Sequence, residues 1–181
     1  MGNNENIKIL GFVGSLRKGS YNKMLMQAFK ENLPANATLE VVNIENLPLY
    51  NQDMEDNFPR EAMDLKQKIE SADAIIIATP EYNRSTSGVL KNAIDWTSRP
   101  YGTTTWKGKK ILIVGASMGN VGTALAQYNL KQIFSYLDAN VLGQPEFYVS
   151  MAQNKFDEKG NLIDESTKEH IVKAIKALLE K

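Results

Sequence analysis

The sequence predicts an α/β fold, in which a five-stranded parallel sheet carries helices on both faces. Short apolar runs typical of buried strands alternate along the chain with longer stretches whose apolar residues recur at helical spacing. This alternation indicates parallel strands joined by right-handed crossovers. The chain has 181 residues, of which 43% are hydrophobic and 23% charged, so we expect residues 1–181 to form a single domain around one core.

The first strand is expected at 7–13 (IKILGFV), a short, apolar run rich in β-branched residues. A helix follows from Tyr21, because apolar side chains recur at helical spacing over 24–29. A second strand is expected within 39–44. Residues 51–57 are polar and carry three carboxylates, but their spacing does not match a calcium-binding EF-hand loop, so we expect a solvated loop.

The third strand is expected at 72–79, a continuous apolar run typical of the centre of a parallel sheet. A helix over 60–70 precedes it. Another helix begins after Gly88 and ends at Arg99-Pro100, because the residue before a proline disfavours helical backbone. Residues 101–109 are expected to form a polar loop.

The fourth strand is expected at 110–114, and a helix from about 123 to 137 follows it. The fifth strand covers 139–143 and 146–149 and is broken by Pro145. After a tight turn at 156–162, Asp164 is expected to cap a final helix over 165–180.

The loop between the first strand and the first helix, residues 14–22 (GSLRKGSYN), predicts a phosphate site. Backbone N–H groups at a helix start lack intrahelical acceptors, and the helix dipole favours an anion there. The loop adds glycines for a tight turn, short polar side chains and the planar charged fork of Arg17. A plainer alternative is that Ser20 caps the helix while Arg17 and Lys18 lie in solvent.

This loop matches neither of two common nucleotide motifs. Gly19 is followed by Ser20-Tyr21, so the lysine of a Walker loop is missing and hydrolysis of ATP or GTP is disfavoured. The G-x-G-x-x-G fingerprint of dinucleotide sites is also absent. A single phosphate, as in a mononucleotide cofactor, suits the loop best.

The composition argues against several classes of function. The 21 basic and 21 acidic side chains balance, so neither nucleic acid nor a membrane is expected as a partner. The absence of cysteine excludes thiol catalysis, and the single histidine, His170, cannot build a His-rich site, so no metal is expected. The start of the chain lacks the features of a signal peptide, and the cytoplasm is the expected location.

The alternating elements fit the flavodoxin-like strand order 2-1-3-4-5. In that order the first and third strands are neighbours where the chain reverses direction across the sheet. The loops 14–22 and 80–88 should therefore meet at the carboxyl edge of the sheet, with loop 115–122 beside them.

Three motifs follow these strands: GSLRxxSxN at 14–22, PEYNxS at 80–85 running into GxLKNAIDW at 88–96, and GASMG at 115–119. Together they resemble the NADPH-dependent FMN reductase family, which includes quinone, chromate and azo-dye reductases. The resemblance covers nearly the whole chain. Ser87 and Leu125 depart from the family pattern, which often has proline and arginine at these places.

The resemblance implies that FMN is the cofactor and that NADPH or NADH is the co-substrate. Hydride would pass from the nicotinamide by way of FMN to quinones, azo compounds, metal oxyanions or free flavin, and no separate catalytic residue is assigned because the flavin carries the chemistry. A homodimer or a tetramer is likewise implied. The implied cofactor contacts are Ser15, Leu16, Arg17, Ser20, Tyr21 and Asn22 in the phosphate loop and Pro80, Glu81, Tyr82, Asn83 and Ser117 around the ring.

Other interpretations stay open. A flavodoxin-like electron carrier would bind FMN without direct NAD(P)H turnover, although such carriers tend to present an acidic face, whereas here charge is balanced. A regulatory domain that senses a nucleotide would bind that ligand without turning it over. From the residues alone, Tyr82 could be a half-exposed loop aromatic and Glu81 a charge at a helix N-terminus, and Trp96 is expected in the core or at a subunit contact and not at the flavin.

Overall fold

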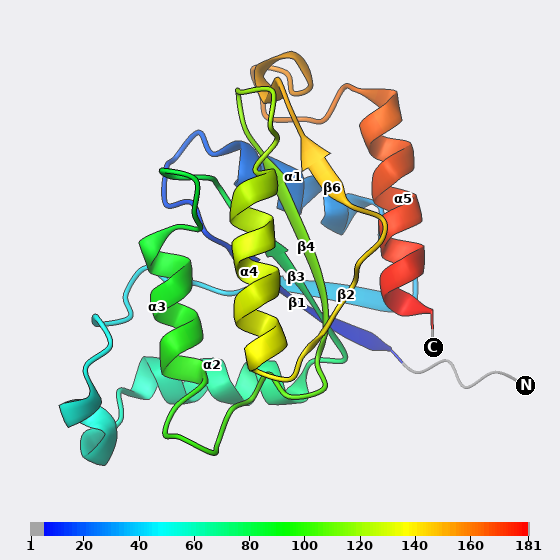
Figure 1. Ribbon diagram of the computed structural model, residues 1–181. Coiled ribbons are helices and arrows are strands. Elements are labelled where there is room, and N and C mark those ends of the chain that lie inside the picture. Colours follow the sequence, from blue (N-terminus) through cyan, green and yellow to red (C-terminus); the bar gives the residue numbers. More distant parts are fainter. Residues whose placement is uncertain (1–5, 181) are drawn as a thin grey trace, which may run out of the picture.

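The computed structural model describes residues 6–180 and shows one parallel sheet in the order β2-β1-β3-β4-β5, with β6 also paired to β4 (Figure 1). The strands are β1 (Ile7–Val13), β2 (Ala37–Val41), β3 (Ala74–Ala78), β4 (Lys110–Ala116), β5 (Asn140–Val141) and β6 (Phe147–Val149). The helices are α1 (Tyr21–Glu31), α2 (Arg60–Ser71), α3 (Gly88–Thr97), α4 (Ala124–Tyr136) and α5 (Glu165–Leu179), with short 3-10 helices η1 (Gln52–Asn57) and η2 (Ala152–Asn154). The predicted flavodoxin-like strand order is confirmed.

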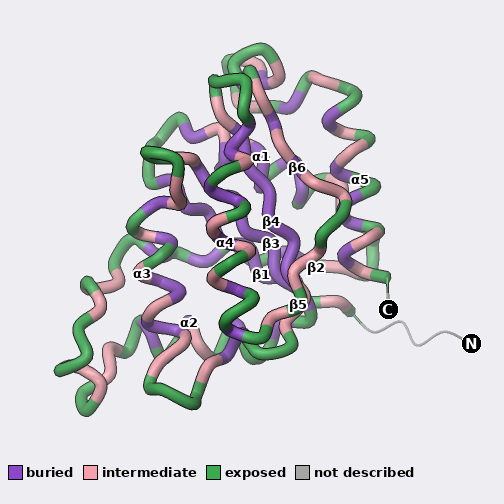
Figure 2. The backbone as a smooth tube through the Cα atoms, viewed as in Figure 1, coloured by how far each residue is buried: buried purple, intermediate pink, exposed green. Residues whose placement is uncertain are grey.

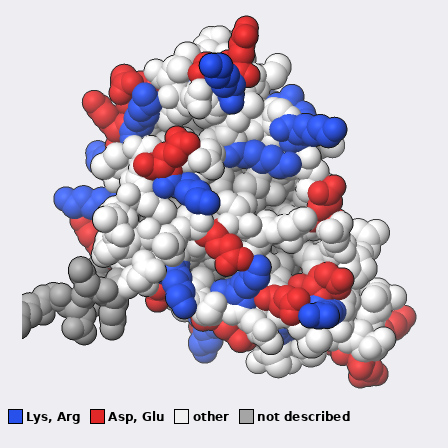
Figure 3. All heavy atoms as spheres, turned by 180° about the vertical axis from the view of Figure 1, so that it is seen from behind, with Lys and Arg blue, Asp and Glu red and all other residues white. Residues whose placement is uncertain are grey.

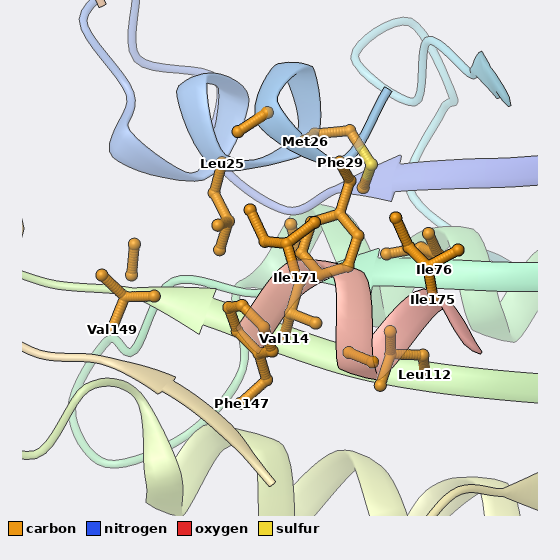
Figure 4. Packing of buried hydrophobic residues seen from close by; sticks show 14 of the residues in the cluster. Leu25, Met26, Phe29, Ile76, Leu112, Val114, Phe147, Val149, Ile171 and Ile175 are labelled. Atoms are coloured by element: carbon orange, nitrogen blue, oxygen red, sulfur yellow. The ribbon is translucent and has the colours of Figure 1, made fainter. Parts of the chain in front are cut away.

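Helices cover both faces of the sheet, because successive strand residues point to opposite sides. On one face, Ile9, Ile76 and Leu112 pack with α1 and α5. Figure 4 shows this layer from close by, with Phe29 and Ile171 reaching the strands from the two helices. On the other face, Phe12 and Ile77 belong to the cluster formed with α2, α3 and α4.

The three central strands are almost wholly buried, whereas the exposed residues lie along the outer faces of the helices and in the loops (Figure 2). All five residues of β3 are buried, which explains its unbroken apolar sequence. The sheet therefore offers its loops, and not its faces, for binding. The loops at its carboxyl edge are the ones in which the motifs were found.

Some elements differ from the prediction. The fifth strand is split into β5 and β6, as the proline at 145 indicated. Residues 52–57 form the 3-10 helix η1 and not an irregular loop; the side chain of Asn51 caps it by accepting from the N–H of Asp53. Strand β4 continues two residues beyond the expected end, to Ala116, because β6 pairs with its carboxyl half.

Trp106 lies in the polar loop but is fully buried. Its ring packs against Phe12 and Phe134, with centroids 5.6 and 4.9 Å away. Its indole N–H donates to Thr97 Oγ1 at 2.9 Å. The loop therefore has an apolar anchor that its overall composition concealed, and it is held against α3.

Within residues 6–180, no helix is both long and apolar enough to cross a membrane. The same part of the chain contains no group of three or more His, Cys, Asp and Glu side chains placed to hold a metal ion.

Candidate functional site

The three motif loops meet at the carboxyl edge of the sheet, as predicted. At Gly14 a Cβ atom would lie 2.9 Å from Ser87 Oγ and 3.0 Å from Pro80 Cδ, so the first loop packs directly on the second. At Gly115, near the end of β4, a Cβ atom would lie 2.6 Å from the carbonyl oxygen of Thr79, so the start of the third loop lies against the residue that leads into the second. Neither position has room for a Cβ atom, because side chains of the second loop lie against Gly14 and a backbone carbonyl lies against Gly115.

Asn22 joins the first loop to the end of β4. Its side-chain oxygen accepts from the Ala116 N–H at 2.9 Å, and its amide donates to the Ala116 carbonyl at 3.0 Å. Because a carboxamide has two N–H donors, one remains for a ligand. The residue is buried, so this bridge fixes the start of α1 relative to the third loop.

The start of α1 has the features of an anion site. Ser20 is the N-cap, and its hydroxyl oxygen accepts from the Lys23 N–H at 3.3 Å, which leaves the hydroxyl proton available to a ligand. Ser15 of the same loop is also buried. The first turn of α1 contains no acidic residue that would compete for its N–H groups. The capping role that was an alternative for Ser20 is therefore compatible with the phosphate role.

Arg17 lies at the exposed rim of this loop. Its guanidinium lies over the ring of Tyr21, 5.4 Å from the centroid, and among residues 6–180 it forms no ion pair. The exposed residue Leu16 accepts from the Lys23 ammonium through its carbonyl oxygen, at 3.3 Å. Arg17 of the loop and Lys23 of α1 therefore place two cations near the start of the helix.

The second loop forms a tight turn. The N–H of Tyr82 donates to the Ser85 carbonyl and the N–H of Ser85 to the Tyr82 carbonyl, both at 3.0 Å. Asn83 and Arg84 have φ values of 51° and 66°, the left-handed geometry of a two-residue hairpin turn. The turn holds Tyr82 half-exposed at the edge of the site.

Glu81 lies at the start of a helix that the sequence did not indicate for it. Its carboxylate accepts from the backbone N–H groups of Leu125 and Ala126, at 3.0 and 3.2 Å, and pairs with Arg84 at 3.0 Å. It is a charge at a helix N-terminus, as one alternative held, but the helix is α4, 44 residues away in the sequence. No local pattern could have indicated this pairing.

Other motif residues are placed as follows. Ser117 in the third loop donates its N–H to the Val149 carbonyl at 2.9 Å, which ties this loop to β6. Pro80 is buried between the loops. Ser87, one of the two departures from the family pattern, caps α3 by accepting from the Leu90 N–H at 3.4 Å. Trp96 is fully buried, and the expectation that it belongs to the core is confirmed.

The residues of this edge fit an FMN phosphate. A cavity of about 250 Å³ lies on the β2 side of the first loop, lined by Ser15, Leu16 and Lys23 together with residues 41–45, and Arg17, Ser20 and Asn22 do not line it. The N–H groups of α1, the remaining donors of Ser20 and Asn22 and the Arg17 guanidinium suit a dianion. A larger cavity of about 590 Å³ lies at the amino ends of the central strands, and it contains none of the motif residues.

Comparisons with known proteins identify the family of the chain. The family described as NADPH-dependent FMN reductase matches residues 7–154. The chain is 45% identical over 165 residues to a 2-hydroxy-1,4-benzoquinone reductase from a Burkholderia species, covering 91% of this chain and 90% of that protein. It is 45% identical over 175 residues to an NAD(P)H-dependent FMN reductase of Pseudomonas aeruginosa, covering 96% of this chain and 94% of the relative.

Among solved structures, FerB of Paracoccus denitrificans, a flavoenzyme described as an NAD(P)H:(acceptor) oxidoreductase, is similar. The TM-score is 0.88 at 37% sequence identity, and the match covers 95% of this chain and 94% of FerB. Family match, curated relatives and shared fold thus extend over nearly the whole chain. The chain belongs to the NADPH-dependent FMN reductase family, and it is an FMN- and NAD(P)H-dependent oxidoreductase.

Proposed function

We propose that the protein binds one FMN at the carboxyl edge of its sheet and reduces small electron acceptors with NAD(P)H. The observation that carries this proposal is the meeting of the three motif loops beside the anion-ready start of α1. In this arrangement the phosphate is held by the first loop, and the ring lies by the second and third. The proposed contacts are Ser15, Leu16, Arg17, Ser20, Tyr21, Asn22, Pro80, Glu81, Tyr82, Asn83 and Ser117.

When bound, FMN supplies the two-electron chemistry, taking hydride from a nicotinamide and giving it to an acceptor. The protein contributes position and electrostatics. The tight turn at 82–85 is rigidly closed by two backbone hydrogen bonds, and the third loop is fixed by Ser117 and Asn22. These constraints support a preorganised edge for the flavin ring, which needs no further acid or base from the protein.

Quinones are the acceptors that we propose first, because the Burkholderia relative is named as a benzoquinone reductase. Azo compounds, metal oxyanions and free flavin are further candidates. The half-exposed ring of Tyr82 beside the loops offers an aromatic surface on which a planar acceptor could stack.

The test is anaerobic reduction of the purified protein loaded with FMN. NADPH or NADH should bleach the visible flavin absorbance, and subsequent addition of a benzoquinone should restore it. A flavin that stays oxidised with either nucleotide would contradict the proposal and favour an electron carrier. Acidic and basic side chains are interspersed on the face shown in Figure 3, which does not favour a carrier with an acidic docking face.

We also propose that the protein forms a homodimer or a tetramer of such dimers. Helix α4 exposes Leu125, Tyr128, Gln132 and Tyr136 at spacings of three and four residues, which places them on one side of the helix. Three of these side chains are large and apolar or aromatic, and they continue the exposed residues Met118 and Val121 of the third loop. A partly apolar helix side next to a binding site suits contact with a second copy of the chain.

Sedimentation analysis at micromolar concentration tests this association. Tyr136→Glu should shift the protein toward monomer, because Tyr136 is 79% exposed and the new charge would be buried in the contact. Tyr101→Glu is the matched control, since Tyr101 is 82% exposed but lies in the loop after α3. A wild-type protein that sediments as a monomer would exclude the proposal.

Location in the cytoplasm is likewise proposed, because NAD(P)H is the electron source, and cell fractionation would test it.

A further inference from the structure

Helix α4 begins without a cap of its own. Its N-cap residue, Thr123, has a left-handed φ of 72° and makes no side-chain capping bond. The Thr123 hydroxyl instead accepts from Gln127 Nε2 at 3.0 Å, and the same amide donates to the Phe147 carbonyl at 2.8 Å. The backbone N–H groups of Leu125 and Ala126 therefore need an acceptor from elsewhere.

Glu81 supplies that acceptor from the second loop. One carboxylate oxygen, Oε2, accepts from both N–H groups, at 3.0 and 3.2 Å, and so takes the place of an N-cap side chain. The other oxygen pairs with Arg84 at 3.0 Å. The Glu81 side chain is 10% exposed, so the helix dipole acts on a charge that solvent screens only partly.

A second bond runs parallel to the first. The hydroxyl of Ser85 donates to Asn129 Oδ1 at 3.0 Å, and Asn129 lies one helical turn beyond Leu125 on α4. Glu81 and Ser85 flank the turn that carries Tyr82 and Asn83. The turn is therefore fastened to α4 on both sides, and its position depends on the start of that helix.

We propose that Glu81 is a positioning residue for the flavin, which acts by holding the 82–85 turn against α4 and not by touching the ring with its carboxylate. Both carboxylate oxygens are engaged by α4 and Arg84, which supports this assignment over direct contact. The carboxylate also occupies the anion position at the start of α4, so the start of α1 is left for the phosphate. The inference rests on the proposed FMN site at this edge.

The test compares variants of the FMN-loaded protein. Asp164→Ala is the matched control for Glu81→Ala, because Asp164 also caps a helix, α5, and pairs with a lysine, Lys155, at 2.9 Å. Both substitutions should lower the melting temperature. Only Glu81→Ala should weaken FMN binding, by about tenfold in Kd, and change the visible circular dichroism of the bound flavin.

Glu81→Gln distinguishes positioning from general destabilisation. Its side-chain oxygen can still accept from the two N–H groups, so FMN affinity and the dichroism signal should return to near the wild-type values. Equal melting losses for the two alanine variants with unchanged flavin affinity and spectrum would overturn the proposal. An Arg17→Ala variant that binds FMN as tightly as the wild-type protein would instead refute the proposed FMN site. The failure of the proposed site and the failure of the positioning role are therefore distinguishable.

Discussion

At the residue scale, two side chains of the first loop have different functions. Asn22 is buried and bonded on both sides to Ala116, so it determines where the loop lies. Arg17 is exposed, and within residues 6–180 its guanidinium stacks on Tyr21 and forms no ion pair, so it is free to turn toward a ligand. Structural and binding functions are therefore separable by substitution, although these residues lie five positions apart.

Arg17→Ala should weaken FMN binding by about 1.5–3 kcal/mol, the loss expected for a charge-assisted hydrogen bond to phosphate. The melting temperature of the protein without FMN should barely change, because the side chain is at the surface. Fluorescence titration of FMN measures the effect. Lys18→Ala, in the same loop and also exposed, is the control and should retain most of the affinity; equal affinity for wild type and Arg17→Ala would refute the role.

Asn22→Ala should lower the free energy of unfolding. It leaves the buried N–H and carbonyl groups of Ala116 without their partner, at a cost of about 1–3 kcal/mol for each group. Urea unfolding measures the loss. Asn32→Ala removes one amide bond to the Ala28 carbonyl at the far end of the same helix and should cost about 1 kcal/mol. Similar losses for the two variants would contradict the bridging role.

At the scale of elements, the helices that start at the carboxyl edge differ in how they are capped. Helices α1, α3 and α5 are capped by Ser20, Ser87 and Asp164, each from the residue that precedes the helix. Helix α4 depends on Glu81 from the second loop. Caps that lie next to their helix can be predicted from sequence, and the cap of α4 could not.

Asp164 provides a prediction about pH. The Thr167 hydroxyl and the Lys155 ammonium stabilise its carboxylate and lower its pKa to about 2, from an ordinary value of 3.8. A depressed folded-state pKa contributes stability that is complete above about pH 4 and is lost as the pH falls toward 2. As a helix cap, Asp164 should stabilise the folded protein by about 1 kcal/mol. The difference in melting temperature between wild type and Asp164→Ala should therefore be constant above about pH 5 and should shrink below pH 4.

The control for this prediction is Asp53→Ala, in η1, whose side chain is exposed and caps no helix. Its difference from wild type should stay small at every pH. A gap for Asp164→Ala that persists unchanged below pH 3 would show that the carboxylate charge does not stabilise α5.

At the scale of the whole molecule, the site is assembled from segments that are distant in sequence. Loops 14–22, 80–88 and 115–122 share one edge because β1, β3 and β4 are adjacent and parallel. One helix on each face contributes to this edge: α1 begins at the first loop, and α4 is joined to the second loop through Glu81 (Figure 1). A ligand that contacts all three loops should therefore stabilise the entire fold.

FMN at a concentration of 100 Kd should stabilise the folded protein by about 2.7 kcal/mol, which corresponds to about 5–10 °C in melting temperature for a chain of this size. Riboflavin, which lacks the phosphate, should produce a much smaller shift at the same concentration. Differential scanning calorimetry on protein freed of flavin measures both. Equal shifts would show that the first loop does not bind the phosphate.

The strand order, most helix and strand positions and the caps Ser20 and Asp164 could be predicted from the sequence, and so could the place of loop 14–22 at the carboxyl edge. These features depend on short-range periodicity and on residues next to the elements they affect. Only the tertiary structure decided that Asn22 bridges to Ala116, that Trp106 is a core residue and that Glu81 caps α4. Each of these contacts joins parts of the chain that folding alone brings together, and no local pattern encodes which partner a buried polar or aromatic group will meet.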